Sequence, residues 1–251
     1  MGAAAEPLKS RLHPADTYSR TFSGVRRAPI PMSKTMSPSV ERRVLLGFAA
    51  TWIGLIAVGM GMLARYSLTP GREGRPPAVW PASSRLERPL DRYTLVVVAH
   101  PHCPCTRATL GELAIVMARC QGRITARVLF VQPRGFTEQW TKSGLWPLAE
   151  NIPETTPVLD EAGLEAGRFA AYTSGQGALY DPEGRLVFRG GMTGARGHEG
   201  ANAGREAIVA LVRNRSPGVT AQTPVFGCPL EGPGLKKAQH LGNEGHRCPN
   251  S

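Results

Sequence analysis

The longest apolar stretch in the chain is Val44–Ala64, in which 21 consecutive residues carry no charged side chain. A helix rises about 1.5 Å per residue, so this stretch is long enough to cross a hydrocarbon core of roughly 30 Å. The pattern predicts one transmembrane helix near the N-terminus. A signal peptide is the alternative, because basic residues precede the stretch. We favour an uncleaved anchor, since the stretch exceeds a usual signal-peptide core and no clean A-x-A site follows it.

Beyond residue 90 the apolar runs have the lengths of strands and helices in a globular domain. Continuous apolar runs at Thr94–Ala99 and Ile124–Val131 predict two buried strands. Between them, apolar residues recur at i, i+3, i+4 and i+7 from Leu110, and Gly122 follows as a stop signal. This spacing predicts a helix over Thr106–Arg119, and hence a strand-helix-strand unit.

The second half of the domain is predicted to contain a hairpin and a closing helix. Asp181-Pro182-Glu183-Gly184 is a strong turn sequence between the short apolar segments 178–180 and 186–189. An amphipathic pattern predicts the last helix at Arg205–Asn214. The order of elements predicts an α/β fold, a central mixed sheet flanked by helices. The remaining expected elements are a helix over Phe136–Ala149 interrupted at Pro147, an extended piece at Thr156–Leu159, and a helix around Glu161–Ala171.

Composition divides the chain into five parts. Residues 65–89 contain five prolines and two glycines, which is typical of an extended tether. The parts are a basic, disordered cytoplasmic tail at 1–43, the anchor at 44–64, the tether at 65–89, the folded domain at 90–215, and a C-terminal extension at 216–251.

The formal net charge of +11 informs the orientation of the chain in the membrane rather than the class of ligand it binds. Basic residues are more frequent before the apolar stretch than after it, which favours a cytoplasmic N-terminus. We therefore expect a single-pass protein of the bacterial inner membrane with its C-terminal domain in the periplasm, where disulfides persist. Nucleic-acid binding is not expected, because no helix-turn-helix, zinc-finger or aromatic RNA-binding pattern accompanies the charge.

The candidate chemistry is Cys103-Pro104-Cys105, between the first predicted strand and its helix. Free N–H groups and the helix dipole at that junction stabilise a thiolate and lower its pKa. We therefore expect Cys103 to attack a partner sulfur and Cys105 to resolve the mixed disulfide. In the alternative, both thiols simply reside unpaired at a turn.

The order of elements, with a dithiol opening the first helix, resembles the thioredoxin fold. The resemblance is closest to the membrane-tethered bacterial proteins that serve cytochrome maturation and periplasmic thiol reduction. It covers roughly residues 90–215, and 96–113 and 177–191 match best. It implies a thiol–disulfide oxidoreductase without a cofactor, whose partner is a protein dithiol or disulfide in the periplasm.

Three departures from that family pattern concern the site. The dithiol is CxC rather than CxxC, so that His102 or Cys103 occupies the usual place of the nucleophile while Pro104 and Cys105 match the second half. The family's cis-proline is expected near Gly175 and is absent, and its tryptophan before the first cysteine is replaced. A disulfide across one residue closes a strained ring, which indicates a labile oxidant or isomerase. If Gly175 removes the substrate groove, the alternative is a redox-inert adaptor.

Three further cysteines have different expected roles. Cys228 follows the closing helix in an apolar stretch, within reach of the dithiol, so it is a candidate third redox position, resolving or protecting thiol, or metal ligand. A buried hydrophobic clip is the alternative for Cys228. Cys120 continues the apolar face of the first helix and is expected in the core, whereas Cys248 lies in a polar tail and is expected to be peripheral.

The glycine-rich loop after the hairpin supplies further candidate neighbours of Cys103. It lacks the ending of a phosphate loop and follows a hairpin strand, so nucleotide binding is not expected. The end of the last strand of a thioredoxin-like sheet lies beside the dithiol. Arg196 and His198 are therefore candidate site residues, His198 as a proton relay or ligand, with a solvated loop histidine as the alternative.

Metal binding is the rival function. Soft thiol and borderline imidazole ligands suit Cu(I) or zinc. A copper-binding chaperone module would hold the ion through Cys103, Cys105, His100 and His102, with Cys228 and His198 as further candidates. The spacing fits no zinc-finger template.

Overall fold

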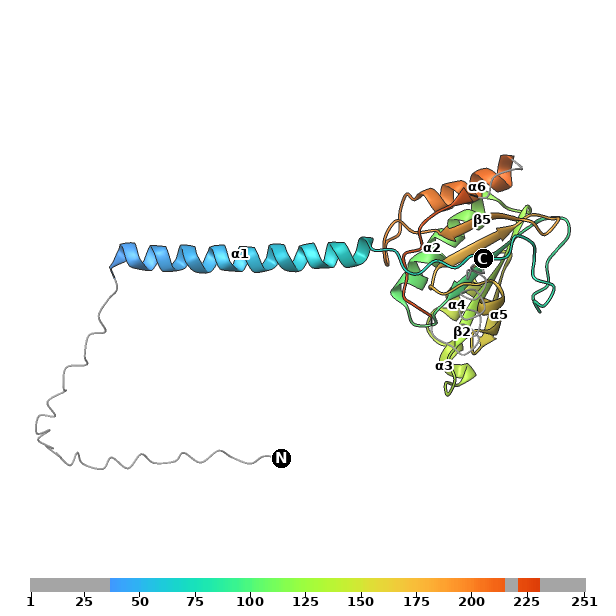
Figure 1. The fold of residues 1–251 in the computed structure, drawn as a ribbon, viewed down its shortest axis with the longest axis horizontal. Helices are drawn as coiled ribbons and strands as arrows, with labels where there is room; N and C mark the ends of the chain where they lie inside the picture. The colour runs from blue at the N-terminus through green and yellow to red at the C-terminus, as the bar shows by residue number, and fades with distance from the viewer. Residues whose placement is uncertain (1–36, 215–220, 231–251) are drawn as a thin grey trace, which may run out of the picture. The chain divides into compact units, whose positions relative to one another are not determined.

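The computed structural model describes residues 37–214 and 221–230. Helix α1 covers Pro38–Leu68, so it extends beyond both ends of the apolar stretch (Figure 1). It contains an 18-residue window with a mean hydropathy of 2.0, of which no part is buried. By length and composition it is therefore able to cross a membrane. The tail up to residue 36 and Cys248 lie outside the described residues.

The domain is built on one six-stranded mixed sheet in the order β3-β2-β1-β4-β5-β6. β1 pairs parallel with β2 and antiparallel with β4, so that Val97 lies between Val128 and Gly177. The strand bounds are β1 Tyr93–Ala99, β2 Ile124–Gln132, β3 Thr155–Glu161, β4 Gln176–Tyr180, β5 Leu186–Gly191 and β6 Ala221–Gln222. The helices of the domain are α2 Pro104–Arg119, α3 Glu138–Lys142, α4 Trp146–Glu150, α5 Leu164–Arg168 and α6 Ala203–Asn214.

Both faces of the sheet are covered, which explains why β1 is continuously apolar. Leu95 and Val97 belong to a core with α2 and α6, two helices that lie side by side (Figure 1). The alternate residues Val96 and Val98 face a second core that includes Phe169. The β1-α2-β2 crossover, the β4–β5 hairpin and α6 form the thioredoxin-like domain that the sequence predicts.

The proline-rich segment before the domain packs onto it, beyond what a tether requires. The Trp80 ring meets the rings of Phe169 and Tyr180 edge-on, with centroids 5.1 Å apart in each pair. The Tyr180 hydroxyl donates to the Pro77 carbonyl at 3.1 Å, and the Leu186 N–H donates to the Ala78 carbonyl at 2.8 Å. This segment therefore helps to cover the second face of the sheet.

Two predicted helices are shorter in the structure. The helix expected over Phe136–Ala149 is two short helices, because Gly144 between them has φ +69°, outside the helical range. The helix expected around Glu161–Ala171 begins only at Leu164, because β3 continues to Glu161. These differences affect the edge of the sheet, while the β1-α2 junction is as expected.

Candidate functional site

Cys103 is the N-cap residue of α2. Its backbone is extended, with φ −96° and ψ 128°, and Pro104 occupies the first helical position. Proline suits that position, because its fixed φ is helical and the N–H that it lacks would have no partner in the helix. The Cys103 carbonyl accepts the first helical hydrogen bond, from the Arg107 N–H at 3.2 Å. The sulfur of Cys103 thus stands at the positive end of the helix.

Three cysteine sulfurs from two distant segments meet at this point. The Sγ atoms of Cys103, Cys105 and Cys228 all lie within 4.8 Å of one another. The Sγ atoms of Cys103 and Cys228 are 3.4 Å apart, although 125 positions separate the two residues in the chain. Cys103 and Cys105 are buried, 5% and 3% exposed, whereas Cys228 is only half-buried. The structure thus brings together the three thiols that the sequence analysis singled out.

The surroundings place a negative charge on Cys103. The Cys105 thiol donates a hydrogen bond to its sulfur, and this is the largest cause that lowers the pKa of Cys103 to about 4. Burial opposes that shift, while the backbone N–H groups of Thr106 and Cys105 and the Cys228 thiol add to it. The same hydrogen bond raises the pKa of Cys105, and burial is the main cause of the raised pKa of Cys228. The cluster therefore holds one thiolate and two thiols.

Residues 223–230, here called the Cys228 segment, reach the site by pairing with the loop before β4. The Ser174 N–H donates to the Cys228 carbonyl at 2.9 Å, and the Leu230 N–H donates to the Tyr172 carbonyl at 2.9 Å. These bonds flank an antiparallel bridge between Thr173 and Pro229. A proline fits there, because the residue in such a non-hydrogen-bonded pair need not donate its N–H. The sulfur of Cys228 is positioned by backbone pairing.

Further contacts hold the Cys228 segment along its length. The Thr223 hydroxyl donates to the Gly191 carbonyl at 2.8 Å, and just before it β6 pairs with β5. The Gly71 N–H donates to the Val225 carbonyl at 2.8 Å. The Arg196 guanidinium donates to the Gly227 carbonyl. The segment is thus attached to the sheet, to the loop after β5 and to the proline-rich segment.

Of the predicted neighbours, Arg196 and Gly175 lie close to the sulfur cluster. Arg196 bonds to the residue before Cys228, and its charge lowers the pKa of Cys228 against the stronger effect of burial. Gly175 has φ +87° and donates its N–H to the Val98 carbonyl at 2.7 Å. No peptide bond in the described part of the chain is cis. The loop that carries Gly175 is the one that pairs with the Cys228 segment.

His100 and His102 lie near Cys103 without joining the sulfur cluster. The exposed His102 ring packs on Trp140, with centroids 4.7 Å apart, and its Nε2 lies 3.1 Å from the Trp140 carbonyl oxygen. Burial lowers the pKa of His100, whose Nδ1 accepts the His102 N–H at 3.3 Å. His100, His102 and His198 are all described, and none belongs to the group of side chains whose ligand atoms converge with the three sulfurs.

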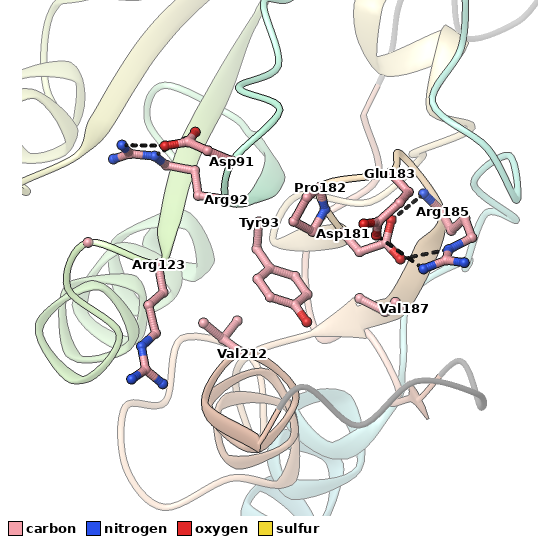
Figure 2. Close-up of a pocket in the computed structure, with 11 residues that line it drawn as sticks. Asp91, Arg92, Tyr93, Arg123, Asp181, Pro182, Glu183, Arg185, Val187 and Val212 are labelled. Atoms are coloured by element: carbon pink, nitrogen blue, oxygen red, sulfur yellow. Dashed lines mark hydrogen bonds and ion pairs between the residues drawn. The ribbon is translucent and has the colours of Figure 1, made fainter.

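A hollow of about 270 Å³ opens beside Cys103, on the side that His102, Arg107 and Leu145 line. A second hollow, of about 340 Å³, lies at the opposite end of β1 (Figure 2). The ion pairs of the second hollow include Arg92 with Asp91, at 3.0 Å. The described lining of the second hollow contains neither a cysteine nor a histidine. The thiol chemistry therefore belongs to the first.

Sequence reasoning missed two polar residues that support the site. The hydroxyl oxygens of Thr106 and Ser174 lie 2.7 Å apart in the buried interior, and the His100 N–H donates to the Thr106 hydroxyl at 3.0 Å. This chain of contacts joins the loop before α2 to the loop before β4. A small polar residue directly after the dithiol was the signal available for Thr106, whereas Ser174 lacked a distinguishing pattern.

Comparisons with known proteins give similarity in structure only. No protein-family model matches the sequence, and no curated protein matches it at a significant level. A hypothetical protein from Sinorhizobium meliloti 1021 is 21% identical over 65% of this chain and 94% of its own, with a TM-score of 0.48. An uncharacterized conserved protein from Geobacillus kaustophilus is 18% identical over 65% and 92%, with a TM-score of 0.47. The pneumococcal exposed lipoprotein thioredoxin of Streptococcus pneumoniae is 14% identical over 49% and 85%, with a TM-score of 0.38.

Proposed function

We propose that this protein is a thiol–disulfide oxidoreductase, anchored by α1 in the bacterial inner membrane with its domain in the periplasm. The observation that carries the proposal is the sulfur cluster, in which the Sγ atoms of three cysteines lie within 4.8 Å of one another at the start of α2. Its surroundings lower the pKa of Cys103 to about 4. A thiolate at a helix N-terminus is the nucleophile and the good leaving group of thiol–disulfide exchange. The partner is a protein dithiol or disulfide, and the chemistry needs no cofactor.

The exchange transfers two electrons in two displacements. The Cys103 thiolate attacks one sulfur of a partner disulfide, forming a mixed disulfide, and the other partner sulfur leaves as a thiolate and takes a proton. Cys105 or Cys228 then loses its proton and attacks the Cys103 sulfur, which releases the second partner thiol. The partner disulfide is reduced to a dithiol and one disulfide forms within the cluster. Exchange in the opposite direction consumes that disulfide and oxidises a partner dithiol.

Equilibration of the full chain in detergent micelles with glutathione redox buffers tests the proposal. A reversible disulfide within the cluster, with a defined midpoint, is the expected result, and peptide mapping identifies its cysteines. Cys103→Ser should abolish it, whereas Cys120→Ala, which removes a buried thiol in the core, should leave the midpoint unchanged. Three thiols that stay reduced in the most oxidising buffer would overturn the proposal.

A soft-metal site is the second candidate, favoured by the same convergence of three sulfurs. Thiolates select Cu(I), and three of them match a trigonal site. The donor set differs from the one expected from the sequence, because Cys228 takes the place of His100 and His102. Binding would require Cys105 and Cys228 to release their protons, so the affinity should rise with pH.

A Cu(I) titration against a competing chelator separates the two candidates. A metal module binds one Cu(I) per chain and loses it in Cys228→Ala, whereas His102→Ala binds normally. An oxidoreductase gives its disulfide midpoint in metal-free buffer. A chain that shows neither behaviour is the redox-inert adaptor.

A further inference from the structure

The most exposed cysteine of the cluster is Cys228, the one that lies outside the dithiol. Cys103 and Cys105 are at most 5% exposed, whereas Cys228 is half-buried. We expect a macromolecular partner to reach Cys228 first, because it is the most exposed of the three cysteines. Cys228 is thus the cysteine of the cluster that a partner can contact most directly.

The Cys228 sulfur is also placed to bond to Cys103. Their Sγ atoms are 3.4 Å apart, so a movement of roughly 1.4 Å forms a disulfide of about 2.05 Å. The two backbone hydrogen bonds on either side of the Thr173–Pro229 bridge fix the register in which the Cys228 segment pairs with the loop before β4. Cys105, by contrast, lies two residues from Cys103 in the first turn of α2, where a disulfide would close a small ring.

We propose that the oxidised domain carries a Cys103–Cys228 disulfide, and that a partner dithiol protein enters by attacking the Cys228 sulfur. This inference rests on the proposed function and assigns its parts. Cys228 is the sulfur that exchanges with the partner, Cys103 is the internal leaving group, and Cys105 is a positioning residue whose thiol holds the charge on Cys103.

Atoms and electrons balance in each step. A partner thiolate attacks Cys228 Sγ, the Cys103–Cys228 bond breaks, and Cys103 leaves with the electron pair as a thiolate. The product is a mixed disulfide between the partner and Cys228. The second partner thiol then loses its proton and attacks the partner sulfur of that mixed disulfide, and Cys228 leaves and takes up a proton. The partner dithiol is oxidised to a disulfide, and Cys103 and Cys228 are reduced.

The direction of attack follows from access and from the leaving group. In exchange the sulfur with the lower pKa leaves faster, and Cys103 is the thiol of the cluster whose pKa is lowered. The thiolate that forms is received by the Cys105 thiol and by the N–H groups at the start of α2. The hollow beside Cys103 is the competing route, through which a small thiol would attack Cys103 directly.

The test uses the full chain in detergent micelles with Cys120→Ala and Cys248→Ser, so that only the cluster reacts. The chain is oxidised with glutathione disulfide and its disulfide is mapped. It is then exposed to reduced thioredoxin whose second active-site cysteine is replaced by serine, so that the mixed disulfide is trapped, and quenched with acid at increasing times. The expected results are a Cys103–Cys228 disulfide and a first mixed disulfide on Cys228.

Each other outcome has a distinct meaning. A Cys103–Cys105 disulfide, or a first adduct on Cys103, overturns this inference and leaves the proposed function intact. No disulfide within the cluster overturns the proposed function itself. Cys105→Ala should still form the Cys103–Cys228 disulfide and take its first adduct on Cys228. In Cys105→Ala, the absence of that disulfide, or a first adduct on Cys103, would likewise overturn the inference.

Discussion

Gly227 lies directly against the backbone of Ser174, since a Cβ atom at residue 227 would stand 1.8 Å from the Ser174 carbonyl oxygen. No side chain fits into this contact, because real Cβ contacts of that length do not occur. The close approach is what allows the next residue, Cys228, to pair with the loop before β4. A glycine that looks unremarkable in the sequence thus sets the position of a reactive sulfur.

Gly227→Ala should therefore displace the Cys228 segment while leaving the dithiol in place. We expect the Cys103–Cys228 disulfide to be lost from mapped oxidised protein, and alkylation of Cys103 to become faster because its cover is removed. The stability of the closed segment should fall by about 1–3 kcal/mol. Gly194→Ala is the matched control, since the nearest atom outside its own chain neighbours, the Ala201 carbonyl oxygen, is 4.0 Å from the added Cβ. An unchanged disulfide in Gly227→Ala would contradict the role assigned to this contact.

The reactivity of Cys103 should persist in acid. Its pKa of about 4 means that the thiolate is present at pH 5 and is protonated only as the pH falls through about 4. Alkylation rates measured between pH 3 and pH 9 should show this transition. Cys105→Ala removes the largest cause of the lowered pKa, so its transition should move to higher pH. A single transition near pH 8.5, the usual value for a cysteine, would show that the charge does not reside on Cys103.

Arg196 should affect the position and pKa of Cys228 rather than the dithiol. Arg196→Ala removes both the hydrogen bond to the Gly227 carbonyl and the positive charge that lowers the pKa of Cys228. We expect the pKa of Cys228 to rise further and the Cys103–Cys228 disulfide to form less completely at a given redox potential. Arg196→Lys keeps the charge and should restore the pKa of Cys228 more fully than the disulfide. Equal pKa values for Cys228 in the alanine and lysine variants would exclude the electrostatic effect.

Asp160 should give the domain a pH dependence unrelated to its thiols. Its carboxylate is 1% exposed and accepts the N–H groups of Glu165 and Ala166 at 2.8 and 2.9 Å. Burial is the largest cause that raises its pKa from 3.8 to about 6. Because the pKa of Asp160 is higher in the folded state, the protonated carboxyl contributes to the free energy of unfolding. This contribution is fully present below pH 3.8 and is lost as the pH rises through about 6, on the order of 3 kcal/mol in all.

Denaturant unfolding at pH 4 and pH 7.5 measures that loss. Asp160→Asn should remove most of the pH dependence, because the amide does not ionise and still offers one acceptor. Glu161→Gln, a change at the exposed neighbouring residue, should retain it. The expectation fails if both variants follow the unmodified protein.

The proline-rich segment should be required for stability. Trp80→Ala removes a ring that packs on Phe169 and Tyr180, and should cost about 2–4 kcal/mol of unfolding free energy. A chain that begins at Leu90 lacks the whole segment and should be at least as unstable, whereas a chain that begins at Thr69 should keep the stability of the domain. Thermal unfolding of the three proteins is the measurement, and equal midpoints would show that the segment is only a tether.

The central elements were predictable because local patterns dictate them. A continuous apolar run fixes β1 between two covered faces, and the proline after Cys103 suits the first position of α2. The hairpin followed from Asp181-Pro182-Glu183-Gly184, which forms the turn between β4 and β5. In each case neighbouring residues carry the information.

The completion of the site depends on contacts between distant segments. Cys228 was singled out for its apolar surroundings. Its backbone pairing with the loop before β4 depends on Gly227 and on residues about 55 positions away. Because such a pairing needs both segments, the sequence near Cys228 alone does not reveal it. The packing of Trp80 was missed for the same reason, because the prolines around it indicate an extended chain whether or not that chain is docked. His102 was a candidate ligand only for the alternative copper site, and its ring packs on Trp140, a residue of α3.

The separation of 125 positions between Cys103 and Cys228 links oxidation to folding. A disulfide there closes a loop that encloses nearly the whole domain, and the lost freedom of the unfolded chain is worth about 4–5 kcal/mol. A Cys103–Cys105 disulfide closes almost no loop and gives no such gain. Reduction by a partner should therefore lower the melting temperature of the domain, and by the same thermodynamic linkage a well-folded domain should hold its disulfide more tightly. The thermal stability of this protein would then report its redox state.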